Sequence, residues 1–151
     1  PRSESGALRV GDMPFVVNLL LGAVLLAGVV WVWWQVYRAG ALSTRVVYAV
    51  APLTAVAMFM VCAPLLSPQF IVWLVPFGAI AWANEERVLG TLVGLGVLTT
   101  MLLTQVYEQL NDDLAVGHAM LAARNAVLVS LVVVGIVRLR ATTRVTALNG
   151  H

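Results

Sequence analysis

The sequence is poor in charge and in cysteine, and it contains no lysine. Charged residues make up 11% of the 151 residues, whereas hydrophobic residues make up 61%. Soluble domains carry about 25% charged residues. A water-soluble globule with so few charged residues could not cover its surface with polar groups, so we exclude a soluble globular protein. Disordered chains have the opposite signature, low hydrophobicity with high net charge, and are excluded as well.

The scarcity of charge and cysteine also excludes several kinds of site. Nine scattered arginines and a net charge of +2 do not make the clustered basic face that nucleic acid requires. The single Cys62 lies in an apolar run, so we predict a small buried side chain rather than a disulfide or a metal ligand. Glu108, Asp112 and Asp113 lack a histidine or further carboxylate that would complete a metal site, and they predict a solvated loop.

The abundant feature is long apolar runs, which predict an all-α polytopic transmembrane helical bundle. A helix needs about 20 apolar residues to span a bilayer. Five runs are present, of which the third is short and the second is broken by Pro52 and Pro64. We expect spans at 15–37, 46–66, 68–83, 88–107 and 119–137. The first span ends in an interfacial aromatic belt, Trp31, Trp33, Trp34 and Tyr37.

The arginines predict the orientation. Five spans place the loops 38–45 and 84–87 and the basic tail 138–151 on one side. By the positive-inside rule that side is cytoplasmic, so we expect a multi-pass protein of the inner (plasma) membrane with a cytoplasmic C-terminus. Residues 1–14 then form an external loop, and the chain begins at Pro1 rather than Met, which suggests a processed product or a piece of a longer protein.

Two polar features at the predicted outer surface suggest an anion site. Ser67 followed by Pro68 is typical of a helix start, because serine caps and proline suits the first helical position. A helix N-terminus offers free N–H groups to an anion, and Gln69 adds an amide that can bind an oxyanion or a sugar hydroxyl. The alternative is a well-capped turn that binds nothing.

Arg124 lies inside the fifth predicted span, where an arginine costs at least about 2.5–3.5 kcal/mol to insert. Such a residue usually faces the bundle interior, and its guanidinium can hold a phosphate with two parallel N–H bonds. The alternatives are snorkelling to the interface or an ion pair with Glu108, Asp112 or Asp113. His118 and Asn125, on the same stretch, are interpreted as interfacial polar residues.

Three further patterns predict helix packing. Phe70, Trp73 and Phe77 recur at helical spacing and form an aromatic stripe. The fourth run carries small residues that allow close helix approach, namely Gly90, Gly94 and Gly96. It also carries polar residues that we expect to form hydrogen bonds between helices, namely Thr99, Thr100, Thr104 and Gln105.

The segment 67–77, SPQFIVWLVPF, resembles a motif of the GT-C class of polytopic glycosyltransferases. The closest resemblance is to bacterial α-mannosyltransferases that use polyprenyl-phosphate mannose, which show Ser-Pro-Gln-aromatic-x-x-Trp-Leu-x-Pro late in the chain. The segment 123–125, ARN, is similar to their Arg-Asn element. The absence of lysine beside nine arginines suits a high-GC actinobacterial source, where such enzymes are common.

The resemblance covers about a tenth of the chain and has departures. Position 70 is Phe where Tyr is frequent, and residues 62–66 lack the basic or amide residue often found there. These enzymes carry their catalytic carboxylate in the first external loop, which has no counterpart here. The resemblance therefore implies the C-terminal membrane region of a longer enzyme, with the catalytic base outside this chain.

The resemblance implies transfer of mannose from a polyprenyl-phosphate donor to a glycolipid or glycan acceptor on the outer side of the membrane, without a cofactor or metal. Ser67, Gln69 and Arg124 would bind the phosphosugar, and Trp73 would line or support the site. The partners would be the lipid bilayer, the lipid-linked donor and the acceptor, and not nucleic acid. A related transferase with another sugar fits the same residues. The alternative function is a non-enzymatic membrane module, such as a transporter half or an assembly subunit.

Overall fold

The computed structural model describes residues 15–39, 44–62, 68–105 and 115–149, and these ranges are helical apart from the turn at 84–86, with no strand among them. The predicted all-α bundle is confirmed. In chain order the elements are α1 (Phe15–Ala39), the π-helix η1 (Val46–Val50), α2 (Ala51–Cys62), the 3-10 helix η2 (Pro68–Trp73), α3 (Leu74–Ala83), α4 (Arg87–Gln105) and α6 (Ala115–Asn149).

Three of the described helices are long and apolar enough to cross a membrane: Phe15–Arg38 in α1, Arg87–Gln105 in α4 and Ala115–Thr142 in α6. The apolar helices Val46–Cys62 and Phe70–Ala83 are shorter. They fall below the roughly 20 residues that a perpendicular span requires. The bundle therefore combines three helices of membrane-spanning length with two shorter apolar helices.

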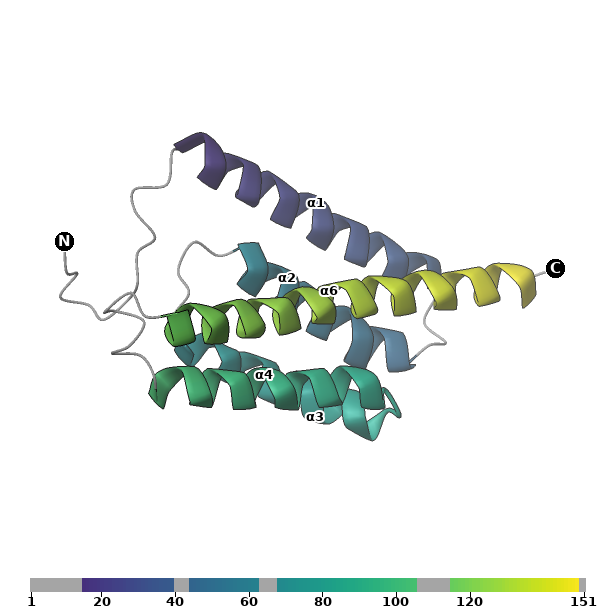
Figure 1. Cartoon of the computed structure of the whole chain (residues 1–151). Coiled ribbons are helices and arrows are strands. Elements are labelled where there is room, and N and C mark those ends of the chain that lie inside the picture. The colour runs from purple at the N-terminus through teal and green to yellow at the C-terminus, as the bar shows by residue number, and fades with distance from the viewer. Residues whose placement is uncertain (1–14, 40–43, 63–67, 106–114, 150–151) are drawn as a thin grey trace.

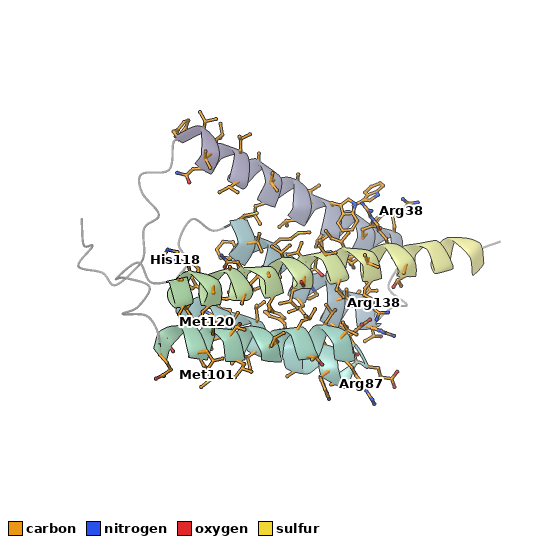
Figure 2. All side chains as sticks on the ribbon, in the orientation of Figure 1. Arg38, Arg87, Met101, His118, Met120 and Arg138 are labelled. Atoms are coloured by element: carbon orange, nitrogen blue, oxygen red, sulfur yellow. The ribbon has the colours of Figure 1, made fainter. Side chains whose placement is uncertain are left out.

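The helices alternate in direction. Figure 1 shows that α1, α3 and α6 run one way and that α2 and α4 run the other way. Arg38, Arg87 and Arg138 lie at one end of the bundle, whereas Met101, His118 and Met120 lie toward the other (Figure 2). We call these the arginine end and the His118 end. The three arginine-bearing segments thus share one end of the bundle, as the sequence predicted.

Pro52 does not break the second helix. A proline ring clashes with the carbonyl four residues earlier and removes one helical N–H. The chain widens into η1 just before the proline, where the N–H of Ala51 donates to the oxygen of Val46, five residues back. This wider turn absorbs the proline, so the helix continues to Cys62. Pro64 lies outside the described residues.

The turn between α3 and α4 is a Schellman motif closed without glycine. Glu85 takes a left-handed conformation with φ 64°. Its N–H donates to the oxygen of Trp82 at 3.2 Å, and the N–H of Glu86 donates to the oxygen of Ala81 at 2.9 Å. The N–H of Gly90 then donates to the oxygen of Glu86 at 3.0 Å, which starts α4. The motif fixes Glu86 between the two helices.

The last helix is longer than the sequence analysis predicted. Residues 115–118 had been assigned to a loop and 138–151 to a tail, but α6 runs from Ala115 to Asn149. Neither glycine nor proline occurs from Ile136 to Asn149, and Gly150 follows the last helical residue. At 1.5 Å per residue, the helix is about 52 Å long, which exceeds the roughly 30 Å of a hydrocarbon core.

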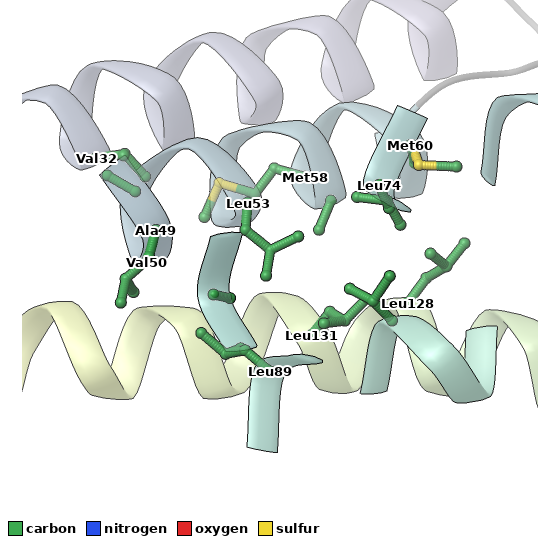
Figure 3. Packing of buried hydrophobic residues seen from close by; sticks show 14 of the residues in the cluster. Val32, Ala49, Val50, Leu53, Met58, Met60, Leu74, Leu89, Leu128 and Leu131 are labelled. Atoms are coloured by element: carbon green, nitrogen blue, oxygen red, sulfur yellow. The ribbon is translucent and has the colours of Figure 1, made fainter. Parts of the chain in front are cut away.

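The core lies where α6 packs against α2 and α4, with α3 closing the far side (Figure 3). It is built of small and branched apolar side chains that include Ala49, Leu53, Leu74, Leu89, Leu128 and Leu131. The helix α1 joins this core through Val32, and Leu25, Trp31 and Val36 pack against it. The first half exposes large apolar side chains, and α1 diverges from α6 there (Figure 1).

Glycines set the closest helix approaches. A Cβ on Gly135 of α6 would lie 2.1 Å from Oγ1 of Thr54 in α2. A Cβ on Gly78 would lie 2.7 Å from a methyl group of Val93, and one on Gly90 would lie 2.8 Å from the ring of Trp82. The close approach predicted at Gly90 is therefore confirmed. The prediction for Gly94 is wrong, because that residue is exposed and has nothing within 4 Å of its Cβ position.

Candidate functional site

Arg124 is a fully enclosed charge in the bundle. Its side chain is 2% exposed, on the stripe of α6 that also buries Leu128 and Leu131. Its Nε and Nη1 atoms are buried and have no hydrogen-bond partner among the described residues. This burial contradicts the alternative that the side chain snorkels to the surface. Glu108, Asp112 and Asp113, the carboxylates considered as its partners, lie outside the described residues.

The position of Arg124 follows from the helix that carries it. Gly135 lies eleven residues later, within about 20° of three full turns, so the two residues share the face of α6 that meets α2. Arg124 is about 17 Å beyond Gly135 toward the His118 end, whereas α2 extends about 12 Å beyond Thr54 before it ends at Cys62. The arginine therefore lies well beyond the contact between Gly135 and Thr54, toward the His118 end.

The contacts of Gly96 show how far along the bundle Arg124 lies compared with the start of η2. A Cβ on Gly96 would lie 3.4 Å from Ile71 of η2 and 3.6 Å from Val127 of α6. Arg124 precedes Val127 by about 4.5 Å along α6, and Pro68 precedes Ile71 by about 6 Å along a 3-10 helix. Because α3, which continues η2, and α6 run the same way, Arg124 and the first turn of η2 lie at similar depth (Figure 1).

The remaining residues predicted for the site have different outcomes. Ser67 lies outside the described residues, so its capping role stays a prediction. Gln69 belongs to the first turn of η2, but its side chain is not among those described. Trp73 is 52% exposed and stacks on Phe59 with ring centroids 6.4 Å apart, which leaves its ring on the outer surface of the bundle. Phe70 tilts against Trp73 at 5.1 Å.

The neighbours of Arg124 include another unsatisfied polar atom. Oδ1 of Asn125 is buried without a hydrogen-bond partner among the described residues. His118 is exposed and lies six residues nearer the start of α6. Consecutive residues of a helix do not face each other, and an amide oxygen accepts hydrogen bonds, so this atom of Asn125 adds no donor for an anion. The N–H donors of the site are those of Arg124, and in an apolar surrounding such groups bind an anion far more strongly than they do in water.

Three threonines of α4 bond to the backbone of their own helix. Oγ1 of Thr100 donates to the oxygen of Gly96 at 2.8 Å, and Oγ1 of Thr104 donates to the oxygen of Met101 at 2.6 Å. Thr99 bonds Leu95 in the same way. The prediction of interhelical bonds was wrong for these three residues, because a threonine in a helix can reach the carbonyl three or four residues back. Gln105 is exposed.

The sequence analysis missed a second charged cluster, at the arginine end. Glu86, which the sequence places in the loop 84–87, is only 3% exposed. Nε of Arg45 donates to its Oε1 at 2.7 Å, and Nε of Arg138 lies 3.5 Å from its Oε2. One buried carboxylate therefore joins the start of the second helix, the α3–α4 turn and α6. Its sequence signal is weak, because the three residues lie in segments far apart along the chain.

The described residues contain no group of three or more metal-ligating side chains. No family model, curated protein or solved structure matches the chain. The functional interpretation therefore depends on the site itself. Its chemistry is that of a cationic hydrogen-bond donor, enclosed in an apolar bundle and level with a helix start, and this arrangement suits a phosphate group.

Proposed function

We propose that this chain is the membrane region of a glycosyltransferase that transfers mannose from a polyprenyl-phosphate donor to a glycolipid or glycan acceptor. The buried guanidinium of Arg124, with two nitrogen atoms unpartnered among the described residues, carries the proposal. Burying a charge is costly unless something compensates for it. A lipid-borne phosphate is a partner that reaches this depth from within the bilayer.

The transfer of a sugar from a polyprenyl phosphate requires a cationic hydrogen-bond donor such as the guanidinium of Arg124. When the sugar leaves a polyprenyl phosphate, negative charge develops on the phosphate oxygens, and fixed N–H donors stabilise that charge in the transition state. Arg124 would bind those oxygens, and Ser67 and Gln69 would add donors from the start of η2. Trp73 would support that start through its stacking on Phe59. The general base would come from outside this chain.

The proposed topology agrees with this chemistry. With the arginine end on the cytoplasmic side, the His118 end faces outward. Arg124 is the tenth residue of α6, about 14 Å along the helix from its outer end. The phosphate would then be held in the outer half of the bilayer, and the C-terminus would lie in the cytoplasm.

The test is mannose transfer in membranes that contain the intact protein. We expect Arg124→Ala to lower the transfer rate from polyprenyl-phosphate mannose by at least about a hundredfold, the scale of losing one transition-state donor. Membrane insertion should be unchanged. Ser130→Ala is the matched control, because Ser130 is an exposed polar residue of the same helix whose hydroxyl donates to the carbonyl oxygen of Ala126, one turn back.

Equal transfer by wild type and Arg124→Ala would remove Arg124 from the site. Transfer at background level in both, together with correct insertion, would instead favour the non-enzymatic alternative, a transporter half or an assembly subunit.

A further inference from the structure

The arginine end carries more positive charge than its carboxylates balance. Segments 38–45 and 138–151 contain five arginines and no aspartate or glutamate. The described carboxylates, Glu85 and Glu86, both lie in the α3–α4 turn. Glu86 is already held by Arg45 and Arg138, and Glu85 lies two residues before Arg87, the first residue of α4. The excess charge therefore lies on the α1 and α6 side of this end.

The excess charge is concentrated along the seam between α1 and α6. The guanidinium carbon of Arg140 in α6 lies 5.5 Å from the ring centroid of Trp31 in α1, a cation–π contact. Arg38 is exposed and lies seven residues after Trp31, on nearly the same face of α1. Trp34 and Tyr37, both exposed, lie on the same last turns of α1 with ring centroids 6.1 Å apart, and they are aromatic side chains typical of the headgroup level.

We propose that the α1–α6 seam at the arginine end binds the phosphate headgroup of an anionic phospholipid, through Arg38 and Arg140. Arginine suits this role because its planar fork matches phosphate oxygens. Basic surfaces between transmembrane helices recognise anionic headgroups in this way. The aromatic side chains place the seam at the depth where headgroups lie. This inference does not depend on the transferase proposal, because it uses the opposite end of the bundle.

The experiment is native mass spectrometry of the purified protein in detergent, titrated separately with phosphatidylglycerol and phosphatidylcholine. The wild type should bind phosphatidylglycerol more tightly. Arg38→Gln and Arg140→Gln should each weaken phosphatidylglycerol binding about fivefold, which corresponds to about 1 kcal/mol per arginine. Arg87→Gln is the matched control, since it removes one exposed arginine from the same end but from the α4 side. It should change the affinity less than twofold.

Three results would overturn the proposal. One is a wild type that does not distinguish the two lipids, and another is an Arg87→Gln variant that weakens binding as much as the seam variants do. Displacement of phosphatidylglycerol by millimolar inorganic phosphate would also overturn it, because it would indicate a phosphate site with no requirement for a lipid. Arg140→Lys keeps the charge and should retain most of the preference. Arg140→Gln removes the cation–π contact with Trp31 and so can alter the packing of α1 against α6. Arg38 is exposed, so Arg38→Gln tests the headgroup site without that change in packing.

Discussion

Replacing Arg124 with methionine distinguishes a ligand-binding arginine from a structural one. Methionine is unbranched and flexible, so it can fill much of the space that the arginine stem occupies. A structural arginine would be paired, and removing one partner of a buried ion pair costs about 3–5 kcal/mol. An arginine kept for a ligand contributes no such stability to the ligand-free protein.

The expected magnitude follows from the environment of the side chain. It is 2% exposed, and its Nε and Nη1 atoms lack partners among the described residues. Replacing a poorly compensated buried charge with an apolar side chain of similar volume is often neutral or stabilising by about 1–4 kcal/mol. Methionine leaves a small cavity, which costs about 1 kcal/mol. We therefore expect Arg124→Met to leave the free energy of unfolding unchanged or to raise it by about 1–2 kcal/mol.

The assay is equilibrium unfolding of the purified protein in mixed micelles, followed by circular dichroism. Leu128→Ala, one turn further along the same stripe, is the positive control. It removes a core side chain that is 1% exposed and should cost about 2–5 kcal/mol. A loss of about 3 kcal/mol or more in Arg124→Met would refute the reasoning and would assign the arginine to a structural ion pair.

Two further predictions concern the packing. Gly135→Ala should destabilise the fold by about 1–3 kcal/mol, because its Cβ would overlap Oγ1 of Thr54. Gly94→Ala should be neutral or slightly stabilising, because nothing lies within 4 Å of its Cβ position. The unfolding midpoints of the two variants check both predictions, and equal midpoints would contradict the close contact at Gly135. Glu86→Gln should lower the free energy of unfolding by about 1–3 kcal/mol. This loss is smaller than that for a fully buried ion pair, because the side chains of Arg45 and Arg138 are nearly half exposed. Glu85→Gln, at an exposed position, should stay within about 0.5 kcal/mol in the same assay, and similar losses in both variants would refute a specific role for Glu86.

Hydrophobicity made the class of fold predictable, but the ends of the helices depended on local chemistry. The first span and the start at Pro68 agree with the sequence to within two residues, because apolar runs and proline carry strong signals. Pro52 misled the analysis, since a π-helical turn can absorb a proline. The length of α6 was underestimated because the basic stretch from Arg138 was assigned to a tail, whereas arginine does not end a helix.

The candidate site was predictable in part. Arg124 was found because a charge in an apolar run is a strong anomaly, and its burial agrees with that interpretation. Glu86 was missed because its ion pairs join segments that only the tertiary fold brings together. The outward position of Trp73 could not be predicted either, because spacing defines a helix face without saying what covers it.

The most direct test of the proposed site compares the affinity of the purified protein for polyprenyl phosphate with its affinity for the uncharged polyprenol. Excess phosphatidylglycerol should be present to occupy the α1–α6 seam. A hydrogen bond to a charged group contributes about 1.5–3 kcal/mol, so the wild type should prefer the phosphate by roughly 10-fold to 150-fold. Arg124→Met should abolish that preference and leave polyprenol binding unchanged. An equal preference for the phosphate in both proteins would contradict the assignment of Arg124 as the phosphate-binding residue.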